Sequence, residues 1–313
     1  MREPYVVFHG GFHKTATSHI QSMLARNTGH LKKRGVLYVH HRHTRKELTV
    51  PCQLYVYEQK GMDYRTKYTA KELANKTSAF FNEMIDENDD CDRIIFSEEN
   101  LAGHCGHCVK RGLLYLWRKE FIETISSQFP WQVQEVHLGV RNYADFFASA
   151  YVEYLRSLKK TDFVDEMEMR KRVMAHMPSW AKVLQIVQDY FPNARLTVWK
   201  FEDFRILDRQ VIKNLCGPKI DVSKLALPKD KNKRPSASGK AVEALLELIH
   251  RNGVETALKN RVALQEQYPR NEKYGGYDPW TAAERAHLSR VYERDLIEIR
   301  SNPDINLMEV ENA

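Results

Sequence analysis

The chain has no long hydrophobic run. A membrane-spanning helix needs roughly 18 or more consecutive apolar residues, and no stretch of the 313-residue sequence provides them. The chain also enters its first apolar run at residues 5–8, which leaves no room for the charged, apolar and small-residue zones of a signal peptide. We therefore expect a cytoplasmic protein without a transmembrane segment.

Cysteine is also scarce, and its number is odd. The chain has five: Cys52, Cys91, Cys105, Cys108 and Cys216. A chain of this length can fold without disulfides, so reduced thiols are expected. Cys105 and Cys108 have the Cys-x-x-Cys spacing of a redox dithiol or of half a zinc site. No second ligand pair completes a zinc site, and we interpret the motif as a solvent-facing loop near an acceptor cleft. A redox or zinc-linked protein built on this pair is an alternative.

A strong charge imbalance is missing as well. The sequence holds 48 Lys and Arg against 41 Asp and Glu, which gives a net charge of +7. So mild an excess suits an anionic nucleotide and does not call for a nucleic-acid partner. The chain also shows no internal repeat and no low-complexity tract.

Strand-like and helix-like runs alternate along the chain. The strand-like runs are residues 5–8, 36–39, 94–96, 133–140 and 196–199, and the helix-like runs are residues 70–86, 113–129, 143–158 and 180–190. Residues 40–67 form a polar and aromatic stretch to which no helix or strand is assigned. The alternation predicts an α/β fold of three layers, with a central parallel sheet flanked by helices.

The same pattern predicts one domain in three parts. Residues 1–216 form the core, residues 217–238 a connection or lid rich in Lys, Pro and Ser, and residues 239–313 a helical C-terminal elaboration. In the last part, residues 241–249 and 282–299 are amphipathic and should cover the sheet or pair with each other.

A basic, hydroxyl-rich turn follows the first strand. Residues 10–18 read Gly-Gly-Phe-His-Lys-Thr-Ala-Thr-Ser and lead directly into a helical pattern. A helix start offers unpaired backbone N–H groups and the positive end of the helix dipole. Lys14 adds a full charge, and the hydroxyls of Thr15, Thr17 and Ser18 add donors. The turn is therefore predicted to bind a phosphate or sulfate.

This turn is not a Walker A motif. No Gly-x-x-x-x-Gly-Lys-Ser/Thr sequence passes through it. A nucleotide kinase would also need Mg²⁺ and a carboxylate on a second strand, so a kinase or another nucleotide- or phosphate-binding protein is kept only as an alternative. No resident metal is expected.

A second anion-binding pair follows residues 133–140. Arg141 leaves the strand, and Ser149 lies two helical turns further along. A forked guanidinium and a hydroxyl at this spacing could converge on one phosphate. The competing interpretation pairs Arg141 with Asp145 at helical spacing.

Together, the run Lys-Thr-Ala-Thr-Ser at residues 14–18 and the Arg141/Ser149 pair resemble the sulfotransferases that use 3′-phosphoadenosine 5′-phosphosulfate (PAPS), in particular bacterial, carbohydrate-type members. The resemblance implies a P-loop-like fold, PAPS as donor and PAP as product. It implies that Arg141 and Ser149 hold the 3′-phosphate. It assigns the 5′-phosphosulfate to Gly11, Phe12, His13, Lys14, Thr15, Ala16, Thr17 and Ser18. One departure is Ala16, where the family usually has Gly.

Two looser matches complete the resemblance. Residues 93–101 read as a buried strand ending in Glu98 and Glu99, and carbohydrate-type members place a catalytic Glu after such a strand. Residues 270–277 are similar to the basic loop over the nucleotide, which implies that Arg270 and Lys273 bind the cosubstrate. The acceptor implied is a sugar first, with lipids and small alcohols as other options.

The chemistry assigns roles to the candidate residues. Lys14 would neutralise the charge that grows on the leaving phosphate, and an acceptor hydroxyl would need a general base. We rank Glu99 first, Glu98 second and His13 third for the base. Glu99 lies just after a buried strand that should end on the same side of the sheet as the loop-bearing first strand. Only one of the two glutamates should reach the cleft, because neighbouring side chains at a strand end point to opposite faces. The competing interpretation treats both glutamates as carboxylates at a helix N-terminus.

Overall fold

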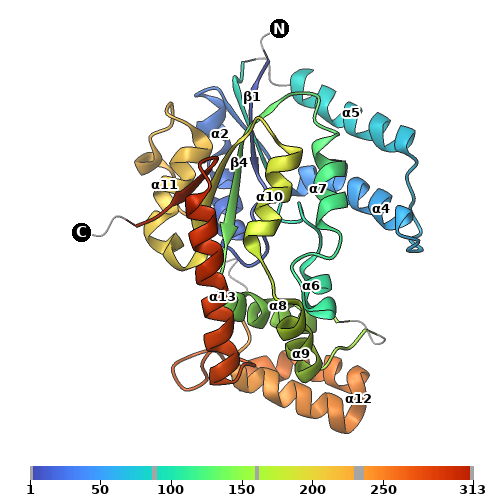
Figure 1. Cartoon of the computed structure of the whole chain (residues 1–313). Helices are drawn as coiled ribbons and strands as arrows, with labels where there is room; N and C mark the ends of the chain where they lie inside the picture. Colours follow the sequence, from blue (N-terminus) through green and yellow to red (C-terminus); the bar gives the residue numbers. More distant parts are fainter. Residues whose placement is uncertain (1–2, 87–89, 159–161, 229–235, 311–313) are drawn as a thin grey trace.

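The centre of the fold is a six-stranded, all-parallel sheet with the strand order β2-β3-β1-β4-β5-β6 (Figure 1). The computed structural model describes residues 3–86, 90–158, 162–228 and 236–310. The strands are β1 (Tyr5–His9), β2 (Val36–Val39), β3 (Arg93–Ser97), β4 (Val133–Val140), β5 (Arg195–Lys200) and β6 (Ile305–Met308).

Helices cover both faces of the sheet. One face carries α1 (Thr17–Arg26), α2 (Thr28–Lys32) and α11 (Phe204–Cys216). The other carries α5 (Ala70–Asp86), α7 (Arg118–Ser126), α10 (Trp180–Tyr190) and α13 (Ala282–Ser301). Both layers exist because the strands are apolar on both sides: Val6 and Phe8 of β1 belong to one core and Val7 to the other. The predicted three-layer α/β fold with a parallel sheet is confirmed.

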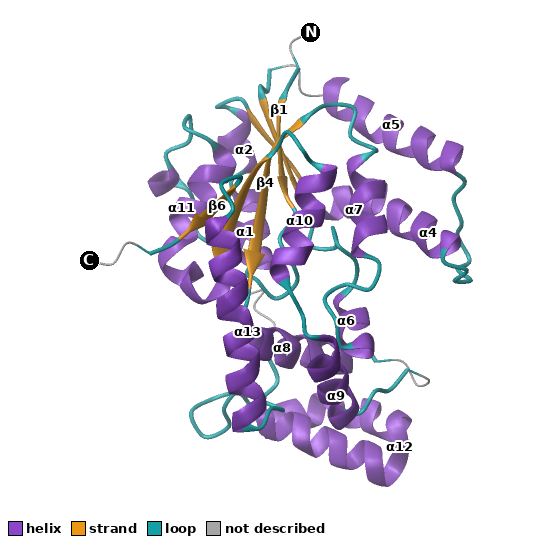
Figure 2. Ribbon diagram, viewed as in Figure 1, coloured by secondary structure: helices purple, strands orange, loops and turns teal. Residues whose placement is uncertain are grey.

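A further group of helices lies beyond the ends toward which the strand arrows point (Figure 2). It comprises α6 (Cys105–Arg111), α8 (Tyr143–Arg156), α9 (Glu166–His176) and α12 (Gly239–Gln267). Helix α12 lies far from the sheet in Figure 1, so residues 241–249 do not cover the sheet.

No helix within the described ranges is both long and apolar enough to cross a membrane.

Several predicted elements match closely. The strands at residues 36–39 and 133–140 and the helices at residues 70–86 and 180–190 have the predicted bounds. The helix predicted over residues 113–129 begins only at Arg118, because Gly112 and Tyr115 adopt left-handed backbone angles, with φ of 65° and 52°. Strand β6 was not predicted.

The stretch of residues 40–67 is largely helical, contrary to the prediction. It contains α3 (His41–Thr44), a π-helical turn η1 (Arg45–Thr49) and α4 (Val50–Gln59) in direct succession. Short 3₁₀ turns lie at η2 (Phe201–Asp203) and η3 (Val222–Lys224).

The connection or lid predicted over residues 217–238 is described in part. Its residues 229–235 lie outside the described residues.

Candidate active site

The predicted site residues gather where parallel strands end. The loops that follow β1, β3, β4 and β5 all leave the same edge of the sheet, because the strands run in one direction. Carboxyl edges of this kind are where open α/β sheets bind ligands. The candidate site therefore lies between this edge and helices α6 and α8.

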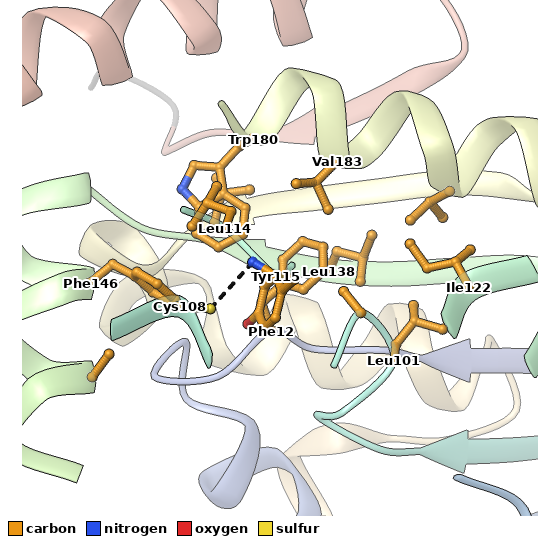
Figure 3. Packing of buried hydrophobic residues seen from close by; sticks show 14 of the residues in the cluster. Phe12, Leu101, Cys108, Leu114, Tyr115, Ile122, Leu138, Phe146, Trp180 and Val183 are labelled. Carbon is orange, nitrogen blue, oxygen red and sulfur yellow. Dashed lines mark hydrogen bonds between the residues drawn. The ribbon is translucent and has the colours of Figure 1, made fainter. Parts of the chain in front are cut away.

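The loop after β1 is held in shape from inside. The Thr15 hydroxyl donates to the Phe12 carbonyl at 2.5 Å, and the Thr17 hydroxyl donates to the Gly11 carbonyl at 3.2 Å. Both threonines are buried, and Ser18 is exposed. Phe12 stacks on Trp180 with ring centroids 4.9 Å apart, inside the aromatic core drawn in Figure 3. The two threonine hydroxyls thus shape the loop, and Ser18 offers its hydroxyl to the outside.

Ala16 occupies a conformation that favours glycine. As the residue before α1 it has φ 70° and ψ 11°, in the left-handed region. An L-residue with a Cβ is strained there by about 1–2 kcal/mol. Glycine adopts this backbone conformation without strain, because it has no Cβ.

Ala16→Gly is therefore expected to stabilise the protein by up to about 1 kcal/mol, since the relief of strain exceeds the added flexibility of the unfolded chain. Urea unfolding measures the change. The matched control is Ala79→Gly, at an exposed position in the interior of α5, where the same exchange should destabilise by about 1 kcal/mol. A loss of stability at both positions would contradict the strain at Ala16.

Lys14 links the loop to α8 and to the end of β4. Its ammonium Nζ lies 3.6 Å from a carboxylate oxygen of Glu153, and its backbone carbonyl accepts a hydrogen bond from Arg141 Nη1 at 2.9 Å. The two predicted anion-binding motifs, the loop and the strand end, are thus in direct contact.

Arg141 is held on several sides. Its guanidinium lies over the ring of Phe201 at 4.2 Å, and its buried Nε has no hydrogen-bond partner among the described residues. Burial lowers the pKa of Arg141, and the nearby charge of Arg270 acts in the same direction. Asp145 forms an ion pair with Arg285 at 3.0 Å, and its charge also acts on Arg141, where it raises the pKa against the effect of burial.

Ser149 lies on the side of α8 that faces the loop. Residues four apart in a helix share a face, and Glu153, four residues after Ser149, contacts Lys14. Ser149 is half-buried. The structure thus brings Lys14, Arg141 and the Ser149 face of α8 together.

The two glutamates after β3 share one arginine. Arg45 Nη2 donates to Glu98 at 2.8 Å and to Glu99 at 3.0 Å, and Arg45 Nε donates to Glu98 as well. The expectation that the two side chains point to opposite faces is wrong, because β3 ends at Ser97 and both residues lie beyond the pleat. Neither caps a helix, since the next helix begins at Cys105.

The carboxyl groups of Glu98 and Glu99 differ in burial and in the direction of their pKa shifts. Glu98 is completely buried, and this burial raises its pKa despite the partnership with Arg45. For Glu99, burial also acts to raise the pKa, but the interactions with His13, Arg45 and Lys14 outweigh it and the net shift is downward. The side chain of Glu99 is 24% exposed, so Glu99 is the carboxylate that can meet a ligand.

His13 is hydrogen-bonded to Tyr115, a tyrosine with a strained backbone conformation. The Tyr115 hydroxyl accepts a hydrogen bond from the backbone N–H of His13 at 3.1 Å and lies 3.2 Å from its Nδ1. Tyr115 adopts a φ of 52°, an outlier for a bulky residue and a form of strain that is concentrated at functional sites. Burial lowers the pKa of His13 to about 4, so the imidazole is neutral at pH 7.

The Cys-x-x-Cys motif is helical and buried, which corrects its interpretation as a solvent-facing loop. His104 caps α6 by accepting the Gly106 N–H on Nδ1 at 3.1 Å. Cys105 and Cys108 are turned into the core, where Cys108 Sγ accepts the Tyr115 N–H at 3.3 Å (Figure 3). Burial raises the pKa of Cys105 to about 12, so its thiol is protonated at neutral pH. Among the described residues, no three His, Cys, Asp or Glu side chains are grouped as metal ligands.

The loop of residues 270–276 follows α12 in the chain and folds back to form hydrogen bonds with the residues at the start of that helix. Gly276 forms an antiparallel bridge with Ser238, and Gly239 N–H donates to the Gly275 carbonyl at 2.9 Å. Arg270 is close enough to Arg141 for its charge to act there. Lys273 lies over the ring of Tyr274 at 5.1 Å.

Three residues at the site were not predicted from the sequence: Arg45, Tyr115 and Glu153. Arg45 lies in the stretch to which no element was assigned, and Tyr115 lies in the first part of a predicted helix, the part that does not form. Glu153 could have been predicted from the sequence, because it lies one helical turn after Ser149 and therefore on the same face of the helix.

No protein-family model and no curated protein match the chain. Among solved structures, a crystal structure of a sulfotransferase from Alicyclobacillus acidocaldarius is similar over 87% of this chain and 98% of that one, at 12% sequence identity and a TM-score of 0.41. So weak a likeness leaves the function to be inferred from the site itself.

Proposed function

We propose that the protein is a sulfotransferase that moves a sulfuryl group from PAPS to an acceptor hydroxyl, most suitably that of a carbohydrate, by in-line displacement. The observation that carries the proposal is the 2.9 Å hydrogen bond from Arg141 to the Lys14 carbonyl. It joins two anion-binding motifs that lie 127 residues apart in the sequence. Two adjacent anion sites suit a nucleotide that carries phosphate groups at two positions.

The residues then have distinct roles. The loop N–H groups, Lys14 and Ser18 would bind the 5′-phosphosulfate, and Lys14 would stabilise the charge that develops on the leaving oxygen. Arg141 and Ser149 would hold the 3′-phosphate. Glu99 would take the proton of the acceptor hydroxyl, because it is ionised and partly exposed.

The remaining residues support this arrangement. Glu98 would fix Arg45, and Arg45 in turn would orient Glu99. Arg270 and Lys273 would extend the cationic surface over the nucleotide.

We further propose that residues 1–313 act as one domain in the cytoplasm, with residues 217–238 as the connection to the C-terminal helices.

Binding of the product nucleotide tests this function. Adenosine 3′,5′-bisphosphate in the presence of EDTA should raise the melting temperature in proportion to the logarithm of its concentration above Kd. A kinase would need Mg²⁺ for a comparable effect, and a redox protein would show none. Incubation with PAPS and candidate acceptors, read by mass spectrometry, then tests transfer directly. No stabilisation by the nucleotide would contradict the proposal.

Arg141→Ala should weaken binding of adenosine 3′,5′-bisphosphate by about 2–4 kcal/mol, because a charge-assisted contact is lost, and Ser149→Ala should cost about 1 kcal/mol. Calorimetric titration measures both. The control ligand is adenosine 5′-phosphate, which lacks the 3′-phosphate and should lose little affinity in the same variants. Equal losses for the two nucleotides would show that these residues do not recognise the 3′-phosphate.

A further inference from the structure

A fully buried histidine contacts the loop after β1 from inside the protein. His9 is the last residue of β1, and its side chain is 0% exposed. A Cβ placed on Gly11 would lie 2.6 Å from His9 Nε2 and 2.6 Å from Thr17 Oγ1. Because Gly11 has no side chain, the edge of the imidazole and the threonine hydroxyl can both approach the loop backbone at this point.

A tryptophan has the same relation to the other buried threonine of the loop. Trp199 of β5 is 0% exposed. A Cβ placed on Gly139 would lie 2.9 Å from Trp199 Nε1 and 3.0 Å from Thr15 Oγ1. The rings of Trp199 and His9 stack, with centroids 5.8 Å apart. Two stacked rings thus bring one nitrogen each close to the two buried threonines.

The hydrogen bonds of the other ring nitrogen show where the proton of His9 lies. His9 Nδ1 is 2.8 Å from Ser97 Oγ, which accepts a hydrogen bond from Gln21 Nε2 at 3.2 Å. Within the described residues, the Ser97 proton has only His9 Nδ1 as its acceptor. Burial lowers the pKa of His9 to about 3, so the ring is neutral at pH 7. Nδ1 therefore accepts, and Nε2 carries the proton.

The two nitrogens near the loop are buried donors that lack an acceptor. His9 Nε2 and Trp199 Nε1 have no hydrogen-bond partner among the described residues. An unpaired buried donor is costly and rare in native proteins, and it calls for an explanation. The Thr15 and Thr17 hydroxyls give their protons to loop carbonyls. Each hydroxyl oxygen still has lone pairs, so each is a suitable acceptor close to an unpaired donor.

We infer that His9 and Trp199 are positioning residues for the ligand of this loop. When an anion binds and the loop tightens around it, His9 Nε2 donates to the Thr17 hydroxyl and Trp199 Nε1 donates to the Thr15 hydroxyl. The two bonds hold the loop backbone so that its N–H groups point at the anion. Ligand binding and the pairing of the two donors therefore stabilise each other.

The inference deepens the proposed function and rests on it for the identity of the anion, the phosphosulfate end of PAPS. The loop geometry, the burial of both rings and the two unpaired donors do not depend on that identity. Inorganic sulfate is therefore a second probe of the same loop.

The first measurement follows the indole N–H proton of Trp199 by NMR in the wild-type full chain. Saturation with adenosine 3′,5′-bisphosphate should move this signal downfield, because its donor gains an acceptor. The signal is assigned by its loss in Trp199→Phe. The indole signal of Trp280, whose Nε1 already donates to the Ala144 carbonyl at 2.9 Å, should stay in place. An unchanged Trp199 signal in the saturated protein would overturn the inference.

The second measurement separates the donor of His9 from the rest of its side chain. Glutamine can place an amide N–H where His9 has Nε2, whereas the shorter asparagine can replace only Nδ1. His9→Asn should therefore weaken binding of adenosine 3′,5′-bisphosphate by about tenfold, and His9→Gln should keep most of the affinity. Trp199→Phe keeps an aromatic ring, loses the N–H and should weaken binding by a similar factor. Calorimetric titration measures all three.

His137→Asn is the matched control. His137 is also 0% exposed and lies opposite His9 in the sheet register, but its Nε2 is bonded to Glu135 at 2.8 Å. This variant should lose stability and keep its affinity for the nucleotide. Equal affinities of His9→Asn and His9→Gln, or an equal loss in His137→Asn, would overturn the inference.

Titration with inorganic sulfate keeps the inference apart from the proposed function. A wild-type chain that binds sulfate but not adenosine 3′,5′-bisphosphate would contradict the proposed function. The same variants then test the inference with sulfate alone, where His9→Asn should again bind more weakly than His9→Gln. Wild-type sulfate affinity in both His9→Asn and Trp199→Phe would overturn the inference.

Discussion

Lys14→Ala is expected to lower kcat by about a hundredfold or more. Under the proposed function, the ammonium group would balance negative charge that grows on the leaving phosphate only as the sulfuryl group departs, so its contribution would fall mainly on the transition state. Loss of one preorganised stabiliser of this kind typically costs about two to three powers of ten in kcat. Steady-state kinetics with saturating PAPS measure the effect.

The ion pair between Lys14 and Glu153 supplies a control. Glu153→Gln removes the carboxylate that lies 3.6 Å from Lys14 Nζ and leaves the lysine in place. This variant should retain kcat within a few-fold and should bind adenosine 3′,5′-bisphosphate more tightly than the wild type. If Lys14→Ala changed only KM and left kcat near the wild-type value, Lys14 would be a binding residue alone.

Glu99→Gln should remove most of the activity and leave the affinity for the nucleotide nearly intact. A general base acts on the proton of the acceptor and not on the donor nucleotide. Loss of a positioned base typically lowers the rate by about a hundredfold to ten-thousandfold. The two measurements are kcat for sulfuryl transfer and calorimetric titration with adenosine 3′,5′-bisphosphate.

The dependence of kcat/KM on pH gives an independent check. A base works only when deprotonated, so activity falls as the pH drops through its pKa. Since nearby positive charges hold the pKa of Glu99 below the usual carboxyl value, the acidic limb should lie at lower pH than for an ordinary glutamate. This limb should disappear in Glu99→Gln.

Glu98→Gln is the neighbouring control. Glu98 is buried and bonded to Arg45, so its substitution should lower stability and should reduce activity less than Glu99→Gln does. A fully active Glu99→Gln enzyme would move the search for the base to Glu98 and His13.

The sheet was predictable because its strands are strongly patterned. Residues 133–140 include four apolar residues, Val133, Val136, Leu138 and Val140, and the helix of residues 180–190 has regular apolar spacing with a clear stop at Pro192. The turn between β1 and α1 was equally predictable, because Lys14 and its hydroxyl neighbours lie directly between a strand pattern and a helix pattern. Its role in anion binding stays a prediction. Local pattern alone supports these assignments.

The unpredicted parts depend on contacts between distant residues. The helix that carries Arg45 combines a histidine-rich start with Pro51 and has no clear apolar stripe, and it is fixed by ion pairs to Glu98 and Glu99. Tyr115 leaves the helical conformation, and its hydroxyl bonds His13, far from it in sequence. Spacing along the chain does not carry such information.

The strand order also determines when the site can form during folding. The central strand β1 pairs with β3 and β4, so Tyr5 meets Arg93 and Val6 meets Val133 only after long intervening segments have been synthesised. Such non-local parallel pairing is slow. A Cβ on Gly139 of β4 would lie 2.8 Å from Thr15 Cβ, which shows how closely β4 supports the anion-binding loop. The loop therefore lacks this support until β4 joins the sheet, and a folding intermediate without β4 would also lack the hydrogen bond from Arg141 to the Lys14 carbonyl.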